Sequence, residues 1–221
     1  MKVCTDSSLF GAWIASKIED KTINPKTILD IGTGTGLLSL MLAQKTNAAI
    51  DAVEIDKNAF EQASQNVNTS SWNNHIKIFN ADIKKWNPPL KYDLIISNPP
   101  FYENDLLPES EARSVAKHSA ALTLEELIVI AKKLLNEDGT FAVLLPWHRT
   151  NLFENTVLKY SLFIKEKIEV KQTPLHNYFR TMLILQKAKI ETINSELSIK
   201  NNSSEYSDEF KDLLKDYYLY L

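Results

Sequence analysis

The chain has little of several features that would assign it to a specialised class. Its 221 residues include a single cysteine, Cys4, so no internal disulfide can form and we expect a reducing compartment. No stretch approaches the roughly 18 apolar residues of a membrane helix, and Asp6 beside a short apolar run argues against a signal peptide. One cysteine and four scattered histidines give no metal-ligand spacing. We therefore expect a cytoplasmic protein without membrane or metal.

The chain also lacks an overall positive charge, because its formal net charge is −3. Contact with nucleic acid would have to come from a local patch. One candidate is the stretch 159–189, where seven basic minus two acidic side chains leave an excess of five. Alternation along a strand places Lys165, Lys167 and Lys171 on one side, where they would suit phosphates. Lysines that protect an edge strand from aggregation explain the pattern equally well.

Apolar runs alternate with helical patterns, which predicts βαβ units and a mainly parallel sheet. We expect strands at 27–30, 50–54, 75–79, 92–97 and 141–145, with Gly139 closing the connection into the last. The expected helices are 37–45, 58–68, 124–135 and about 152–160.

The C-terminal part reads differently from this alternating pattern. Two β-rich runs, 163–171 and 179–186, are joined by a short polar link, which predicts an antiparallel hairpin at a sheet edge. After residue 190 the composition turns polar and ends in a predicted helix over 207–218. A hydrophobic content of 44% suffices for one substantial core.

Glycine is scarce, and its distribution is informative. Three of the five glycines fall in Asp30-Ile31-Gly32-Thr33-Gly34-Thr35-Gly36, between the first predicted strand and its helix. Glycines at such a place let a ligand approach the backbone closely, against a helix N-terminus. Leu37 holds the position of the third glycine in the dinucleotide fingerprint, which disfavours a nicotinamide or flavin.

Polar residues follow the next three predicted strands. Glu54 ends the second strand, where a carboxylate can accept both hydroxyls of a ribose, and Asp82 follows the third. Asn98 follows the fourth. Singly, a strand-end acid or a turn aspartate is common, and Asp56 is better explained as a helix cap. Because ligands bind at the carboxyl ends of parallel strands, four such signals at four consecutive strands predict one crevice.

The tetrapeptide Asn98-Pro99-Pro100-Phe101 indicates what that crevice does. The Asn98 side chain and the Pro99 carbonyl supply two acceptors, and Phe101 offers a flat face for a heteroaromatic ring. Together they can hold a planar amine. Taken alone, the tetrapeptide is equally typical of a strand that ends in an Asn-Pro turn.

The glycine segment 30–36, Glu54, Asp82 and the tetrapeptide together resemble the class I S-adenosylmethionine-dependent methyltransferases, and among them the amino-group methylases. The resemblance implies an α/β, Rossmann-like fold with a mainly parallel seven-stranded sheet and a terminal antiparallel hairpin. It also implies a methyltransferase domain over 1–190, with 191–221 as a C-terminal extension packed on it.

Motifs at both ends of the chain make this resemblance specific to one family. Met1–Asp6 followed by Leu9–Trp13, and the tail from Tyr206 to Leu219, look like the tRNA1(Val) adenine-37 N6-methyltransferase family. The match covers nearly the whole chain. Phe101 stands where many relatives have tyrosine, so one hydroxyl is missing.

The resemblance implies roles for particular residues. Those implied for S-adenosylmethionine are Asp30, Gly32 and Gly34 at its methionine part, Glu54 at the ribose, Asp82 and the Ile83 backbone at the adenine, and Thr5 with Asp6 near the methionine end. An alternative for the last position is that Asp6 or Ser7 merely caps the first helix. Asn98, Pro99 and Phe101 are the implied catalytic residues.

The implied reaction methylates N6 of an adenine in tRNA, at position 37 of a valine tRNA. Two acceptors would bind the hydrogens of the amine and stabilise the charge that grows on nitrogen. Unstacking a base costs least in a single-stranded loop, and a tRNA anticodon loop meets this condition, although the sequence alone does not select it. The alternatives are a guanine-N2 methylase of ribosomal RNA, a protein-glutamine N5 methyltransferase and a non-catalytic binding module. We expect a monomer.

Overall fold

Five parallel strands form the part of the sheet that carries the predicted crevice. The computed structural model describes residues 4–99 and 122–220; Phe101 lies outside them. In spatial order the strands are β3 (Ile76–Asn80), β2 (Ala49–Glu54), β1 (Thr27–Ile31), β4 (Tyr92–Ser97) and β5 (Leu135–Pro146). The strand order reverses where β1 pairs with β2 on one side and with β4 on the other. Sheets of this kind bind ligands at that switch point.

The rest of the sheet is mixed. β7 (Tyr178–Gln186) pairs antiparallel with both β5 and β6 (Phe163–Lys171), which confirms the predicted hairpin. Its predicted place at the edge is wrong, because β8 (Ile193–Ser198) pairs in parallel with β6 and covers it. The described chain thus forms an eight-stranded sheet instead of the seven strands expected. β8 is mostly polar and exposed, with only Leu197 buried, so it gives no hydrophobic strand signal.

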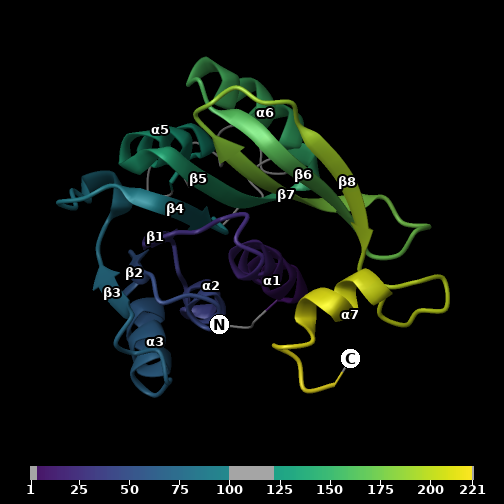
Figure 1. Cartoon of the computed structure of the whole chain (residues 1–221), viewed down its shortest axis with the longest axis horizontal. Helices are drawn as coiled ribbons and strands as arrows, with labels where there is room; N and C mark the ends of the chain where they lie inside the picture. Colours follow the sequence, from purple (N-terminus) through teal and green to yellow (C-terminus); the bar gives the residue numbers. More distant parts are fainter. Residues whose placement is uncertain (1–3, 100–121, 221) are drawn as a thin grey trace, which may run out of the picture.

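Helices cover both faces of the sheet (Figure 1). One face carries α1 (Thr5–Glu19), α2 (Leu37–Ala43) and α7 (Asp208–Leu214), whose apolar side chains share one core cluster with alternate strand residues such as Ile28. The other carries α5 (Leu124–Leu134) and α6 (Thr150–Lys159), which pack with the opposite residues, such as Leu29 and Ile31. This division follows from the period of two along a strand. α3 (Lys57–Asn68) buries Ala63 and Val67.

Two boundaries correct the expectations. β5 begins at Leu135, directly after α5, so Gly139 lies within the strand and does not close a connection into it. The pairing of β4 with β5 shifts register there, and a Cβ at Gly139 would come within 2.8 Å of the Leu135 side chain. Only glycine fits this close approach. The C-terminal helix is shorter than predicted and ends at Leu214.

The C-terminal segment is tied to the first helices. Phe210 and Leu214 of α7 are fully buried in the core cluster of α1 and α2. Lys45, just after α2, forms ion pairs with Glu19 and Asp216 at 2.8 and 2.6 Å. A domain division at residue 190 stays a prediction. In the part of the chain that the structure describes, no helix is long and apolar enough to cross a bilayer.

Candidate active site at the carboxyl ends of the parallel strands

The turn between β1 and α2 is open where a ligand would approach it. Gly32 and Gly36 have φ values of 72° and 82°, which side chains rarely adopt. At Gly36 an added Cβ would meet Ala63 of α3 at 3.6 Å, so this glycine faces protein. At Gly32 an added Cβ would meet nothing within 4 Å. The backbone at Gly32 therefore borders free space beside the carboxyl end of β1.

Asp30 lies fully buried at the end of β1 beside this turn. One carboxylate oxygen, Oδ2, accepts hydrogen bonds from Thr33 Oγ1 at 2.6 Å and Ser39 Oγ at 2.7 Å. The other, Oδ1, is buried without a hydrogen-bond partner among the described residues. Burial raises the pKa of Asp30 to about 6, against the opposing effect of the two hydroxyls. An orphaned buried oxygen of this kind calls for a hydrogen-bond donor that the described residues do not supply.

Glu54 joins the glycine turn to the end of β2. Its Oε2 accepts from the Gly34 backbone N–H at 2.8 Å, and its Oε1 accepts from the Asp56 N–H at 2.9 Å. The residue is only 8% exposed, so it is not a solvated strand-end acid. Each ionised carboxylate oxygen retains further acceptor capacity. Asp56 accepts from the Ala59 N–H as the N-cap of α3, which confirms its predicted role.

The end of β3 lies beside the end of β2. The Ala81 N–H donates to the Glu54 carbonyl at 3.0 Å, and Asp82 follows directly. Asp82 accepts from the Lys84 N–H as the N-cap of a short 3-10 helix, η1 (Ile83–Lys85). Ile83 is buried in the core. The turn role of Asp82 is thus observed, and its contact with adenine stays a prediction.

Asn98 reaches the same region from the end of β4. The Ser97 hydroxyl donates to the Ile31 carbonyl at 2.9 Å, which fixes the end of β4 beside the glycine turn. The Asn98 Nδ2 donates to Ser7 Oγ of α1 at 2.8 Å. This bond uses the amino group of the amide, and the Oδ1 atom on the other branch takes no part in it. Pro99 is buried next to it.

No local pattern in the sequence indicates the contact between Asn98 and Ser7. Helix α1 begins at Thr5 with Cys4 in the cap position and no side-chain cap bond, so the expectation that Asp6 or Ser7 caps it is wrong. Asp6 instead accepts from Arg180 Nε of β7 at 2.6 Å. Thr5 is exposed, and no hydrogen bond joins its side chain to another described residue. The structure thus brings Asp30, the glycines, Glu54 and Asn98 to one edge, but gives Thr5 no contact there.

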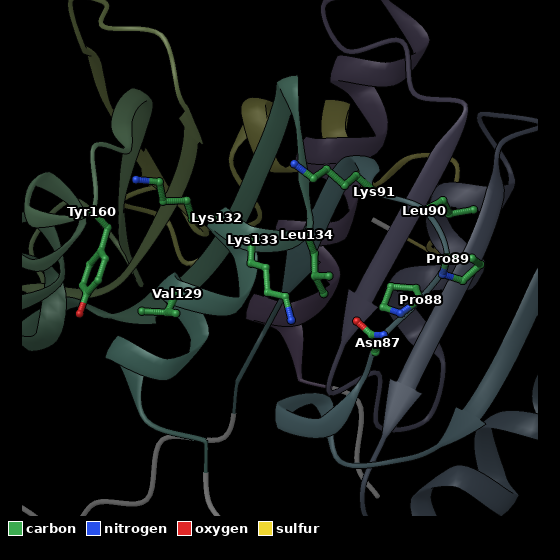
Figure 2. Close-up of a pocket in the computed structure, with 10 residues that line it drawn as sticks. All are labelled: Asn87, Pro88, Pro89, Leu90, Lys91, Val129, Lys132, Lys133, Leu134 and Tyr160. Carbon is green, nitrogen blue, oxygen red and sulfur yellow. The ribbon is translucent and has the colours of Figure 1, made fainter.

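Two cavities in the described chain lie at the other end of the parallel strands, beside their amino ends. One of about 600 Å³ is formed by the segment Asn87–Lys91 before β4, by α5 and by Tyr160 (Figure 2). Another of about 480 Å³ lies beside the amino ends of β1, β4 and β5 and includes Asp93, Glu137 and Asp138. Neither cavity includes a residue of the predicted crevice.

The chain is similar to known proteins over almost its whole length. Residues 11–169 match the family model of the methyltransferase small domain. A tRNA1(Val) (adenine(37)-N6)-methyltransferase of Trichodesmium erythraeum is 41% identical, over 99% of this chain and 91% of that protein. A protein of the same name from Pseudoalteromonas translucida is 37% identical, over 99% and 92% respectively.

Solved structures share the fold. A predicted O-methyltransferase from Agrobacterium tumefaciens superposes with a TM-score of 0.71 at 14% identity, over 93% of this chain and 95% of that one. A putative class I S-adenosylmethionine-dependent methyltransferase from Listeria monocytogenes gives 0.64 at 17% identity, over 86% and 64% respectively. The predicted Rossmann-like α/β fold class is confirmed, with the strand count corrected above.

Proposed function

We propose a function for this chain from one premise: it belongs to the methyltransferase small domain family, and within it to the tRNA1(Val) (adenine(37)-N6)-methyltransferases. The proposed reaction transfers a methyl group from S-adenosylmethionine to N6 of an adenine in tRNA, at position 37 of a valine tRNA. The observation that carries it is the meeting of the glycine turn, Glu54 and Asn98 at neighbouring strand ends.

The residues at this edge fit S-adenosylmethionine. The buried Oδ1 of Asp30 lacks a donor among the described residues, and the cofactor carries an ammonium group that can supply one. The free space above Gly32 lets a ligand lie against the backbone. In the proposal, Asp30, Gly32 and Gly34 hold the methionine part, with Thr5 and Asp6 near it. Glu54 holds the ribose, and Asp82 with the Ile83 N–H holds the adenine. When bound, S-adenosylmethionine supplies a methyl group attached to a positively charged sulfur.

Asn98 and Pro99 act on the amine that receives the methyl group. The amine is a poor nucleophile because its lone pair is delocalised into the purine. The Asn98 Oδ1 and the Pro99 carbonyl each accept one N–H of the amine and stabilise the positive charge that grows on nitrogen. The new N–C bond replaces the S–C bond, and the nitrogen then releases one proton to water. Phe101, outside the described residues, is proposed to stack on the base.

The choice of adenine 37 in tRNA follows the names of the relatives, and the energy of extruding a base favours an unpaired position such as one in the anticodon loop. Extruding a base costs a few kcal/mol and least where it is already unpaired. We propose that a monomer acts on this loop in the cytoplasm. The same two acceptors would suit guanine N2 or a glutamine amide, so the product must be identified chemically.

Nucleoside analysis tests the proposal. The purified protein is incubated with isotopically labelled S-adenosylmethionine and unmodified total tRNA, and the digested nucleosides are identified by mass spectrometry. Labelled N6-methyladenosine is the expected product. Labelled N2-methylguanosine from ribosomal RNA, or label in protein, would instead select one of the alternatives.

A further inference from the structure

The basic stretch that the sequence singled out is not a free cationic surface. Four of its seven cations are neutralised by acids from other elements: Lys167 by Glu154, Lys171 by Glu196, Arg180 by Asp6 and Lys187 by Glu137, at 2.6 to 3.2 Å. Two of the three lysines of the predicted stripe are in this set. The prediction that this stripe faces phosphates is therefore not supported by the charges around it.

The larger of the two cavities at the amino ends of the strands is lined by three lysines that no described acid neutralises. Lys91, Lys132 and Lys133 line it, and none of them forms an ion pair with another described residue. Figure 2 shows Lys132 and Lys133 on α5, between Tyr160 and the segment Asn87–Leu90. We call this cavity the lysine groove.

The walls of the lysine groove are apolar and accessible. Leu90 and Val129 are 43% and 42% exposed, and Pro88 and Pro89 lie beside Leu90. The Tyr160 hydroxyl donates to Glu125 Oε1 at 2.6 Å, which fixes the ring at one end. Cations that no described acid neutralises, beside apolar side chains, suit a sugar-phosphate backbone, whose sugars are apolar on one side.

An ordinary structural role accounts for only part of this arrangement. Lys132 and Lys133 lie in the last turn of α5, where positive charge favours the helix dipole. Lys91 belongs to a different segment and lies outside any helix. The smaller cavity nearby carries Asp93, Glu137 and Asp138, so a polyanion would meet cations at one cavity and acids at the other.

The lysine groove is within reach of a large substrate held at the crevice. The two lie at opposite ends of β4, whose six residues span roughly 20 Å at about 3.3 Å per residue. Helix α5 connects the two regions: Glu126 in its first turn forms an ion pair with Lys84, just after Asp82, at 3.8 Å, and its last turn carries Lys132 and Lys133. A tRNA bound at the crevice by one loop extends well beyond this distance.

We propose that the lysine groove binds the sugar-phosphate backbone of the tRNA substrate, away from the methylated base. This inference rests on the proposed function for the identity of the RNA. In this proposal the lysine groove contributes affinity for tRNA, and the crevice carries out the methyl transfer. Loss of the groove cations therefore weakens tRNA binding without changing the rate of the bound complex.

Direct binding tests this assignment. Fluorescence anisotropy gives the Kd for unmodified valine tRNA, with S-adenosylhomocysteine present, as a function of salt. For Lys132→Ala/Lys133→Ala we expect Kd to rise roughly tenfold and the slope of log Kd against log salt to fall by about 1.5. The charge-conserving Lys132→Arg/Lys133→Arg should stay within about twofold of wild type.

The control removes the same charge elsewhere. Lys167→Ala/Lys171→Ala should bind tRNA within about twofold of wild type, and S-adenosylmethionine affinity should be unchanged in every variant, which verifies folding. Wild-type affinity in the groove variant, or weakening only in the control, overturns the inference. If the wild type binds no tRNA, both proposals fail. If binding depends on the groove but no N6-methyladenosine forms, only the proposed reaction fails.

Discussion

The two ends of the parallel strands use polar groups in opposite ways. At the carboxyl ends, Asp30, Glu54 and Asn98 are buried or half-buried and fixed by short hydrogen bonds. Asp30 accepts from a hydroxyl, Glu54 accepts from a backbone N–H, and Asn98 donates to the Ser7 hydroxyl. At the amino ends, Lys91 and Lys133 are exposed and make no ion pair with a described residue. Fixed dipoles in a site of low polarity stabilise a reacting group strongly, whereas exposed charges act at longer range and are screened by salt. We therefore expect the carboxyl ends to determine the rate of methyl transfer and the amino ends to contribute affinity for the substrate.

The largest change in rate should come from a substitution at the carboxyl ends of the strands, where the methyl transfer is proposed to occur. Asn98→Ala removes one of the two acceptors of the amine and should lower kcat by roughly 100- to 1000-fold. The affinity for S-adenosylmethionine, measured by calorimetry, should be unchanged, because Asn98 lies on a different strand end from the cofactor residues. A variant that turns over at the wild-type rate would show that this amide does not act on the substrate.

A pair of glycine variants tests where the cofactor lies. Gly32→Ala and Gly36→Ala both place a side chain at positive φ, and each should lose about 1–2 kcal/mol in the free energy of unfolding. Only the methyl group at Gly32 projects into free space, so only Gly32→Ala should weaken S-adenosylmethionine binding by more than about tenfold. Equal effects on cofactor affinity would argue against a ligand above Gly32.

The raised pKa of Asp30 predicts a dependence on pH. The ionised carboxylate is needed for the ammonium of the cofactor, so affinity should fall by up to about tenfold per unit below a pH of about 6. Asp30→Asn should bind weakly with no such dependence, since it cannot ionise. Calorimetric titrations between about pH 5 and pH 8 measure both profiles.

The same group affects folding with the opposite sign. Its pKa is about 6 in the folded chain and near 3.8 in the unfolded chain, so between these values the folded chain holds the proton. Without cofactor, this residue therefore lowers the free energy of unfolding as the pH rises through that window. A cofactor-free wild type whose stability follows that of Asp30→Asn throughout would contradict the assignment.

The smallest effect concerns how Asn98 is held. Ser7→Ala removes the hydroxyl bound to the Asn98 amide, and a neutral hydrogen bond is worth about 1 kcal/mol, so kcat should fall about fivefold. KM for S-adenosylmethionine should not change. Ser7→Thr retains a hydroxyl and should restore the rate, whereas a purely structural defect would not respond to this exchange.

Local patterns predicted much of the fold and the crevice. The central strands are mainly apolar, Glu54 ends its strand and Asn98 directly follows its strand, so a single pass along the sequence finds them. β8 was missed because its strand is made by backbone pairing to β6 and not by hydrophobicity. The pairing of Ser7 with Asn98 joins residues 91 positions apart, which no local pattern contains.

The prediction of the basic stripe was misleading for the same physical reason. Two of its three lysines are neutralised by Glu154 of α6 and Glu196 of β8, which only the tertiary fold brings near them. The lysine groove, in turn, is assembled from the segment before β4, from α5 and from Tyr160. Charge counted along the chain therefore did not reveal which cations remain available.

The position of the new methyl group in valine tRNA tests the proposed reaction directly. Unmodified valine tRNA is incubated with the wild type or with Asn98→Ala, digested, and its fragments are sequenced by mass spectrometry. We expect one added methyl group in the fragment that contains adenine 37 with the wild type, and none with the variant. A methyl group at any other nucleotide, or at adenine 37 with both proteins, would contradict it.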